Sequence, residues 1–369
     1  MLAAKRIATG WKVTRGTVAR RLFLDRHAQF WAGRFDGRWA LDEPRGRVVA
    51  VIDEARDVKS FLLRPSARWS GHRAGQYTTV TVEIDGVRLR RCYSLSSAPS
   101  DPLLRITVKR ALNGRVSQWL HDRLRPGDIL HLAAAAGEFV LPEPAPEPLL
   151  FVTGGSGVTP AMSILRDLDA RDAVGDVVLV HYARSRQDAI FAGELRELAA
   201  RHAGLRLAFA FDDDTSGQHA FSEAHLAATV PDFVARATYL CGPPALMARV
   251  ERMWDEAGAA CRLRQERFVA PTVATLPRPS GAEARALTVG LSRSGRRHTV
   301  TDDGTLLEAL ERAGERPRHG CRMGICRTCT CTKRAGAVRN LVTGAVSSEP
   351  DEEIQLCISA PLSNLELDL

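Results

Sequence analysis

The sequence predicts a multidomain protein with an antiparallel β-barrel, an α/β domain built on a parallel sheet, and a smaller C-terminal α+β domain. Three observations predict this order. Residues 46–142 alternate apolar and polar side chains at period two, which is typical of half-buried strands. Residues 148–269 instead combine short apolar runs with helical patterns. A linker rich in Pro, Ala and Gly, at 270–284, then precedes a segment that holds five of the eight cysteines.

Residues 1–45 form a basic and aromatic extension ahead of the first domain. Residues 1–40 carry nine Lys or Arg and two acids, while the whole chain has a net charge of +8, so the remainder is nearly neutral. We interpret the extension as a segment that packs on the first domain, or as one that docks on an anionic membrane surface or an acidic partner. A targeting peptide and a nucleic-acid arm are further alternatives, although the segment is not Ser-rich and we expect no nucleic-acid partner.

The chain shows no pattern for secretion or for membrane insertion. It has no run of 18 apolar residues, and its N-terminus lacks an apolar core followed by a small-residue cleavage site. Its 45% hydrophobic and 25% charged residues are ordinary for a soluble globular protein. We therefore expect a cytoplasmic protein, with residues 1–45 as a candidate peripheral attachment to the inner face of the membrane.

The first domain contains six or so short strands separated by turns, a pattern that predicts a small antiparallel barrel. Its strand-like stretches are GRVVAVIDE, SFLLRP, QYTTVTVEI, VRLRRCYSL and LLRITVKR. The stretch NGRVSQWL, at 113–120, begins a short helix, and the acidic, Pro-rich LPEPAPEP, at 141–148, reads as a connector. The barrel therefore ends near residue 142.

Three stretches of this domain, GQYTTV at 75–80, RCYS at 91–94 and NGRVSQWL at 113–120, suggest a flavin site. A flavin needs a flat aromatic side chain against its ring, a donor near its N5 atom, and cations or helix N-terminal amides for its phosphates. Tyr93 can stack, Ser94 can donate to N5, and Arg91 can hold phosphate. The alternative for Arg91 and Tyr93 is an ordinary strand pair in a barrel core. The candidate flavin contacts are Gln76, Tyr77, Arg91, Tyr93, Ser94, Gly114 and Ser117.

The stretch TGGSGVTP, at 153–160, lies between an apolar strand and a helical pattern. Gly154, Gly155 and Gly157 let the backbone approach a pyrophosphate, whose charge the N-terminus of the following helix favours. We expect Thr159 to cap this helix and Pro160 to be its first residue. The alternative is a plain turn. In its context the loop predicts a dinucleotide site.

The stretch CGPPALM, at 241–247, follows another strand of the same sheet. Cys241 and Gly242 would then lie at the carboxyl end of a parallel strand, where ligands of α/β domains bind. The alternative for Cys241 is a small buried residue with no chemistry.

The stretch ARSRQD follows the second strand of the α/β domain and bears on the choice of nucleotide. Arg184 and Arg186 could hold a 2′-phosphate and would favour NADPH. Asp188 could instead accept from a 2′-hydroxyl and would favour NADH. The two arginines tip the prediction toward NADPH, and solvated loop charges are the alternative.

The stretch CRMGICRTCTC, at 321–331, contains three cysteines spaced C-x₄-C-x₂-C, with a further cysteine at 357, which is the plant-type [2Fe–2S] arrangement. Gly320 and Gly324 give the loop freedom to wrap a cluster. Zinc, disulfides and free thiols are the alternatives, but the stretch has only one C-x₂-C pair and the cysteines cluster in one segment. We predict core packing for Cys331. The predicted metal ligands are Cys321, Cys326, Cys329 and Cys357.

Taken together, RCYS, TGGSGVTP and CGPP resemble the ferredoxin–NADP reductase superfamily, and the C-terminal cysteines resemble a plant-type ferredoxin module. The order flavin, nucleotide, ferredoxin is similar to that of phthalate dioxygenase reductase. The extension and the stretches CRMGIC and IQLC resemble the reductases of bacterial membrane acyl-CoA (stearoyl-CoA) desaturases. The resemblance, over about 46–369, implies a flavin-binding barrel at 46–142, an NAD(P)H-binding domain at 148–269 and a β-grasp ferredoxin domain at 285–369.

The resemblance also implies roles for single residues. It places Ser94 and Cys241 at the reacting centre and Gly242 beside the nicotinamide. It also places Thr159, with the three glycines of its loop, against the nicotinamide nucleotide, and Phe268, in ERFVAP, where an aromatic side chain closes the flavin site. The GRVS turn looks like a pyrophosphate turn and favours FAD, while the phthalate-type members use FMN. FMN therefore stays an alternative.

The implied function is an NAD(P)H-dependent reductase that passes electrons from NADPH, or NADH, through a flavin and a [2Fe–2S] cluster to an iron oxygenase. A membrane fatty-acyl desaturase is the first-choice acceptor. A Rieske dioxygenase, a demethylase or a cytochrome P450 system is the alternative. From another class, a redox-sensing regulatory protein would keep the same cofactors, but the chain has no added effector domain.

Overall fold

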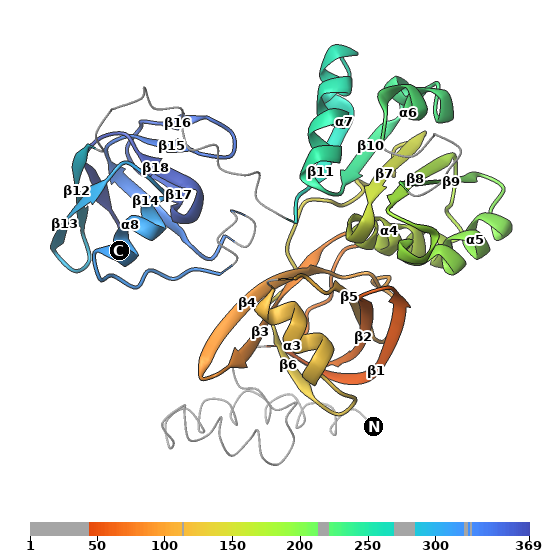
Figure 1. The fold of residues 1–369 in the computed structure, drawn as a ribbon, viewed down its shortest axis with the longest axis horizontal. Helices are drawn as coiled ribbons and strands as arrows, with labels where there is room; N and C mark the ends of the chain where they lie inside the picture. Colours follow the sequence, from red (N-terminus) through yellow and green to blue (C-terminus); the bar gives the residue numbers. More distant parts are fainter. Residues whose placement is uncertain (1–43, 113, 213–220, 269–284, 321–323, 325–326) are drawn as a thin grey trace, which may run out of the picture.

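The computed structural model describes residues 44–112, 114–212, 221–268, 285–320, 324 and 327–369, which form three domains in chain order (Figure 1). Nearly all of the N-terminal extension, the linker at 270–284, and the predicted ligands Cys321 and Cys326 lie outside these residues. No helix of the described part is long and apolar enough to cross a bilayer. The multidomain fold class predicted from the sequence is confirmed.

The first domain is an antiparallel sheet of six strands in the order β4-β3-β6-β1-β2-β5. A helix between β5 and β6 buries Val116 and Leu120 against its interior. The interior holds the inward-facing side chains of every strand, as the period-two pattern requires. The elements are β1 (Arg45–Ala55), β2 (Val58–Pro65), β3 (Tyr77–Ile84), β4 (Val87–Ser94), β5 (Leu104–Lys109), α3 (Arg115–Arg123) and β6 (Ile129–Leu132).

The second domain is a parallel sheet of five strands in the order β11-β10-β7-β8-β9. Every residue of β7 and β8 is buried, because helices cover both faces of the sheet. The strands are β7 (Leu149–Gly154), β8 (Val177–Ala183), β9 (Leu205–Phe211), β10 (Ala237–Cys241) and β11 (Leu263–Glu266). The helices are α4 (Val158–Ala170), α5 (Ala192–Arg201), α6 (Glu223–Thr229) and α7 (Pro244–Glu256).

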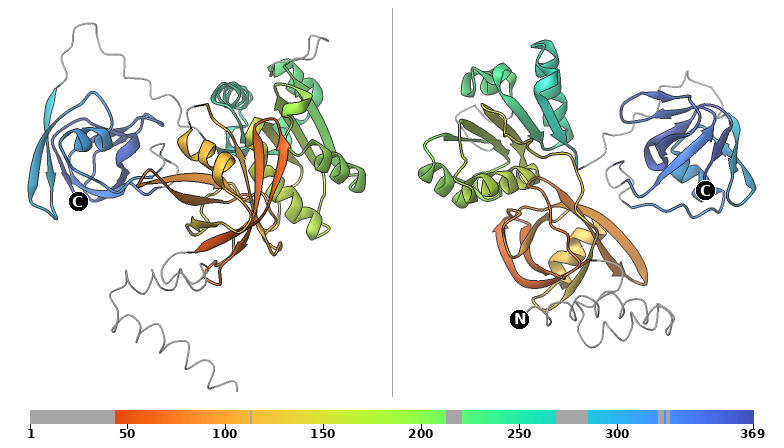
Figure 2. Two further views of the ribbon diagram at one scale, coloured as in Figure 1. Left: turned by 60° about the horizontal axis from the view of Figure 1, so that its bottom comes forward. Right: turned by 180° about the vertical axis from the view of Figure 1, so that it is seen from behind.

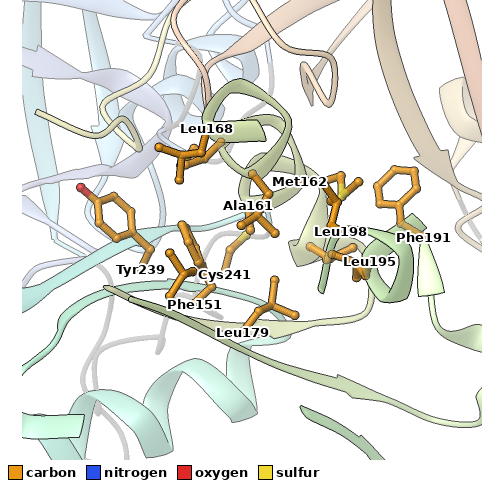
Figure 3. Close-up of a cluster of buried hydrophobic side chains, with 14 of the residues drawn as sticks. Phe151, Ala161, Met162, Leu168, Leu179, Phe191, Leu195, Leu198, Tyr239 and Cys241 are labelled. Atoms are coloured by element: carbon orange, nitrogen blue, oxygen red, sulfur yellow. The ribbon is translucent and has the colours of Figure 1, made fainter. Parts of the chain in front are cut away.

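Alternate residues of β7 face the two helical layers. Phe151 joins the apolar cluster of α4 and α5, whereas Leu150 and Val152 pack with α6 and α7. Figure 3 shows the first cluster, in which side chains of the sheet meet those of α4 and α5. Its labelled members are Phe151, Ala161, Met162, Leu168, Leu179, Phe191, Leu195, Leu198, Tyr239 and Cys241.

The chain reverses its direction of travel through this sheet at β7. It runs outward to β8 and β9, then returns to the other side of β7 to form β10. The carboxyl ends of β7 and β10 therefore mark a topological switch point, where α/β domains bind ligands. A Cβ atom added to Gly157 would lie 2.1 Å from the carbonyl oxygen of Cys241, so the two loops touch through their backbones.

The start of α4 differs from the prediction. A 3₁₀ turn at Gly155–Gly157 leads into the helix, whose first residue is Val158 and whose N-cap is Gly157. Thr159 lies inside the first turn and donates its hydroxyl to the carbonyl of Ser156 at 2.9 Å. The prediction of Thr159 as N-cap and Pro160 as first residue was wrong because the glycine turn begins the helix two residues earlier.

The barrel and the nucleotide domain are joined by a compact polar and aromatic contact. The guanidinium groups of Arg105, on β5, and Arg166, on α4, each lie 5.0 Å from the ring centroid of Phe191. Glu194 accepts from Arg166 at 2.6 and 2.7 Å and lies 3.5 Å from Arg105. Ser163 donates to the carbonyl of Ser97 at 2.7 Å. These bonds hold the two domains in one orientation.

The C-terminal domain packs one helix on a mixed sheet, β13-β12-β19-β14-β17, with a small sheet, β16-β15-β18, beside it. Figure 2 shows it as a separate lobe from two further directions. Thr305 and Glu308 form a capping box on α8, which buries Leu306, Leu307 and Leu310. The elements are β12 (Ala286–Leu291), β13 (Arg296–Thr301), α8 (Leu306–Arg312), β14 (Thr330–Ala335), β15 (Val338–Asn340), β16 (Val346–Ser347), β17 (Glu352–Gln355), β18 (Ser359–Pro361) and β19 (Leu365–Leu367).

The buried Arg236 predicts a pH-dependent contribution to the stability of the nucleotide domain. It is 1% exposed and donates to Asp176 at 3.0 Å and to Asp232 at 2.7 Å. Its hydrogen bonds hold the pKa of both carboxyls below the ordinary value of 3.8. This stabilisation is therefore complete above that pH and is lost as pH falls through the lowered values.

We expect Arg236→Met to lower the stability of this domain by about 2 kcal/mol at pH 7, since several hydrogen bonds of a buried cation disappear. The matched control is Arg206→Met. Arg206 is half-exposed and pairs with the same Asp176 at the longer distance of 3.5 Å, so its loss should cost little stability. Thermal melting at pH 7 and pH 3.5 measures both variants. Equal melting temperatures for Arg236→Met and the wild type at pH 7 would contradict this account.

Candidate functional site

The sequence-predicted flavin residues are largely brought together around one cavity. Its volume is about 270 Å³, and it lies where β4, the start of α3 and the loop at Gly154–Gly157, here called the glycine-rich loop, meet. The walls carry two aromatic side chains, Tyr93 and Phe268, and burial raises the pKa of the Tyr93 phenol, so that its ring stays neutral. Thr159, predicted to face the nicotinamide nucleotide, lines this cavity instead. The predicted flavin residues that line it are Arg91, Tyr93, Ser94, Gly114, Ser117 and Phe268.

The Ser117 side chain ties the start of α3 to the segment before it. Ser117 donates to the carbonyl of Gly114 at 2.9 Å and accepts from the backbone amide of Ala111 at 3.1 Å. A Cβ atom on Gly114 would lie 2.5 Å from the Ser117 hydroxyl, so any larger residue at position 114 would displace that hydroxyl. The cavity thus offers aromatic walls, two cations and a helix N-terminus, which together fit a flavin and its phosphates.

Gln76 and Tyr77, also predicted as flavin contacts, are not part of this cavity. Gln76 accepts from the Arg73 amide of its own turn at 2.8 Å and donates to the carbonyl of the distant Gly137 at 3.3 Å. Tyr77 is 9% exposed and lines a different cleft, described below.

Lys109 belongs to both the flavin cavity and the nucleotide cavity, and sequence reasoning missed it. Its ammonium would lie 3.9 Å from a Cβ atom on Gly155, above the glycine-rich loop. Burial, and then the charge of Arg184, lower its pKa. The one sequence signal was a lysine at the end of LLRITVKR, next to the GRVS turn.

Ser94, Cys241 and Glu266 form a buried group at the junction of the two domains. The Ser94 hydroxyl donates to a carboxyl oxygen of Glu266 at 3.5 Å, and Cys241 and Glu266 are register partners on β10 and β11. Burial raises the pKa of Glu266 to about 8 and raises that of the Cys241 thiol. At neutral pH both groups are therefore protonated. Glu266 was missed because a lone acid at the end of a strand has no distinctive pattern.

The nucleotide cavity has a volume of about 330 Å³ and opens at the switch point. Gly154 and Gly155 form one wall, and the charged residues of the lining are Lys109, Arg184, Asp188, Asp212 and Arg249. Gly157 and Gly242 instead space the two loops, because a Cβ atom on Gly242 would lie 3.1 Å from the amide nitrogen of Gly154.

The predicted charged residues of this region divide into two groups. Arg184 faces the cavity with a side chain that is 65% exposed, whereas Arg186 lies over the Phe211 ring, 5.0 Å from its centroid, and is not part of the cavity wall. Asp188 is buried, and one of its oxygens accepts from Ser185 at 2.8 Å. Arg249, which sequence reasoning missed, lies 5.1 Å from the centroid of Phe221 in the same cavity.

Two of the four predicted metal ligands lie within the described residues, and they converge. The sulfur atoms of Cys329 and Cys357 are 3.2 Å apart, and both residues are buried. The amide of Gly324 donates to the Cys357 sulfur at 3.2 Å, and Gly324 has a φ of +74°. Converging thiols with an amide donor fit a [2Fe–2S] cluster. Cys331 lies in the domain core opposite Ile354, and burial raises its thiol pKa to about 12.

A cleft of about 630 Å³ lies between the cluster loop and the other two domains. Tyr77, Gly137 and Glu266 line it on one side, and Gly324, Arg327 and Ile358 line it on the other. Glu266 therefore contributes both to this cleft and to the contact with Ser94, which borders the flavin cavity. Glu266 thus links the flavin cavity to this cleft, and the backbone of its register partner Cys241 touches the glycine-rich loop at Gly157.

Comparisons with known families match all three domains. The oxidoreductase FAD-binding domain matches residues 46–141, the oxidoreductase NAD-binding domain matches 151–252, and the 2Fe-2S iron-sulfur cluster binding domain matches 290–362. These descriptions agree with the cofactors predicted from the motifs.

Among curated proteins, the chain is 38% identical to an NADPH oxidoreductase of Mycobacterium tuberculosis, over 90% of this chain and 86% of that protein. It is 32% identical to the glycine betaine monooxygenase reductase subunit of Chromohalobacter salexigens, over 89% and 96%. Among solved structures, phthalate dioxygenase reductase is 28% identical over 88% of this chain and 97% of that one, with a TM-score of 0.59. The chain therefore belongs to the family of NAD(P)H-dependent oxidoreductases that join FAD-binding, NAD-binding and 2Fe-2S domains in one polypeptide.

Proposed function

We propose that this chain is the reductase component of an oxygenase system, which takes electrons from NADPH and delivers them singly to an iron-containing oxygenase. The observation that carries the proposal is the position of Glu266. It bonds to Ser94 at the flavin cavity, pairs with Cys241 at the nucleotide loop, and lines the cleft that faces the cluster loop. A chain that only stored or sensed electrons would need no such connected arrangement.

When bound, a flavin accepts two electrons as hydride from a nicotinamide and releases them singly, and a [2Fe–2S] centre carries one at a time. The residues of this chain bind and orient these groups. The loop at Gly154–Gly157 and the Lys109 ammonium would hold the pyrophosphate of the nucleotide. Arg91 and the Gly114–Ser117 turn would hold the phosphates of the flavin.

At the reacting centre the chain supplies neutral groups. Ser94 presents its hydroxyl to the flavin cavity, while Glu266 keeps a proton on its carboxyl near the same hydroxyl. The protonated Cys241 is 0% exposed and packs under the glycine-rich loop. The absence of a fixed negative charge at this point favours transfer of a hydride, which is itself anionic.

The proposal of NADPH rests on the charges of the nucleotide cavity and on one relative. Three cations, Lys109, Arg184 and Arg249, line the cavity against two carboxylates, Asp188 and Asp212, and one Asp188 oxygen already accepts from Ser185. The relative of highest identity quoted above is named an NADPH oxidoreductase.

The acceptor class follows from the names of the other relatives. They are reductases of a monooxygenase and of a dioxygenase, so an oxygenase of this kind is favoured over the membrane desaturase that the sequence first suggested. The desaturase and a peripheral membrane attachment depend on residues 1–45, nearly all of which lie outside the described residues. An affinity capture from cytosol and membranes, with and without these residues, separates the two acceptors.

The proposed route through the C-terminal domain is tested with its buried cysteines. We expect Cys357→Ser to abolish the visible absorption of the cluster and the NADPH-dependent reduction of cytochrome c, because a ligand is lost. Cys331→Ser, equally buried in the same core, should keep both. Reduction of ferricyanide, which can take electrons at the flavin, should persist in both variants. Cytochrome c reduction by Cys357→Ser at the wild-type rate would sink the proposed route.

The choice of nucleotide is tested with the two arginines that follow β8. We expect Arg184→Ala to lower the ratio of kcat/KM for NADPH over NADH by about tenfold, which is the loss of one charge-assisted contact. Arg186→Ala is the matched control, because Arg186 stacks on Phe211 outside the cavity. Steady-state rates with both nucleotides and ferricyanide give the ratio. Equal ratios for the two variants would show that Arg184 does not read the 2′-phosphate.

The role of Glu266 is tested by the pH dependence of hydride transfer. Because its pKa lies near 8, we expect kcat in the wild type to fall as pH rises through 8 and the carboxyl ionises. Glu266→Gln keeps a neutral polar group, so its rate should not fall as pH rises through 8. Its rate at pH 7 should stay within about tenfold of the wild type. Stopped-flow rates of flavin reduction at pH 6–10 measure the profile. A fall near pH 8 that survives in Glu266→Gln would assign it to another group.

A further inference from the structure

The loop of the predicted cluster borders a second open cavity, separate from the cleft that faces the flavin domain. This cavity has a volume of about 570 Å³ and is lined by Cys329, Cys331 and neighbouring threonines of the same segment. It shares no lining residue with the cleft of Gly324 and Ile358. The cluster loop can therefore be approached from the flavin side and, independently, from solvent.

Four arginines surround this second cavity. We call Arg293, Arg296, Arg316 and Arg318 the arginine rim. The side chains of Arg293 and Arg296 are 71% and 61% exposed, while the carboxylates that they bond, Asp368 and Glu315, are 17% and 10% exposed. The guanidinium groups thus face water and their partners lie beneath them.

The other half of the rim carries uncompensated charge. Arg316 and Arg318 are exposed, and within the described part of the chain neither makes an ion pair or a side-chain hydrogen bond. Glu353 is the one exposed carboxylate among the residues that line the cavity. The three lining carboxylates, Glu315, Glu353 and Asp368, offset most of the four positive charges, but the charges that face water are mainly those of the arginines.

We propose that the arginine rim is the docking face for the electron acceptor, and that the acceptor is a protein with an acidic surface around its redox centre. The inference rests on the proposed function. The cations come from two separate segments and spread around an opening, so they fit an extended acidic surface better than one small anion. Exposed charges of one sign steer a partner of the opposite sign and speed its association, and salt screens this effect.

The test uses the double variant Arg316→Glu/Arg318→Glu of the full chain with its cofactors. Its matched control is Arg64→Glu/Arg68→Glu, which makes the same change in net charge at two exposed arginines of the barrel that lack ion pairs in the described part. Cytochrome b5 serves as an acidic protein probe and cytochrome c as a basic one. Calorimetric titration measures binding of each probe at low and high sodium chloride.

We expect the rim variant to bind cytochrome b5 at least about tenfold more weakly than the wild type at low salt, while the barrel variant stays within about twofold. The wild-type affinity should fall as salt rises, and the rim variant should lose this dependence. Equal weakening in the two variants, or tighter wild-type binding to cytochrome c than to cytochrome b5, would overturn the inference.

Electron transfer separates this inference from the proposed function. NADPH-driven reduction of ferricyanide should be the same in all three proteins, which shows that the flavin side is intact. Should cytochrome b5 bind at the rim but receive no electrons, the docking face would stand and the proposed function would fail. Should it be reduced equally well by the wild type and the rim variant, the docking face would fail and the proposed function would stand.

Discussion

The contact between the barrel and the nucleotide domain is the constraint on which the site depends. The guanidinium groups of Arg105 and Arg166 both lie against the Phe191 ring, Glu194 pairs with both, and Glu54 also pairs with Arg105. Burial acts to raise the pKa of Glu194, but the two arginines outweigh it and hold that pKa below the usual value. Each cation–π contact contributes about 1–2 kcal/mol when shielded from water. The contact fixes one domain orientation, which lets Lys109 of the barrel reach over the glycine-rich loop of its neighbour.

The switch point of the sheet then determines the chemistry at that junction. The loops after β7 and β10 approach until Gly157 has room only for a hydrogen toward the Cys241 carbonyl. Cys241 is thereby buried beneath the loop, and its register partner Glu266 is buried beside Ser94. The same close packing that excludes water raises the pKa of both acids. The crowding of the two loops thus explains both the glycine at position 157 and the burial of the Cys241 thiol.

The sequence predicted well whatever depends on local pattern. Strand periodicity gave the order of the three domains, and motif spacing brought Arg91, Tyr93 and Ser94 to one cavity and paired Cys329 with Cys357. What it missed depends on contacts between distant segments. Glu266 is identified as a site residue only by its contact with Ser94, 172 positions away in the sequence. Lys109 is likewise identified only by its position above Gly155. The start of α4 was misjudged because two good local capping residues competed with a glycine turn that the opposing loop requires.

The two approaches to the cluster loop differ in a way that suits one-way electron flow. The inner cleft is also lined by charged side chains, among them Arg264, Arg267 and Arg327, but both of its sides belong to one chain and need not recognise a separate partner. The outer cavity is bordered by exposed arginines, whose attraction to an acidic partner is long in range but weak once the partner is bound. A reductase must release its acceptor after each electron, so a face that speeds association without strengthening the final complex favours turnover. Exposed rather than buried arginines are what this requirement predicts.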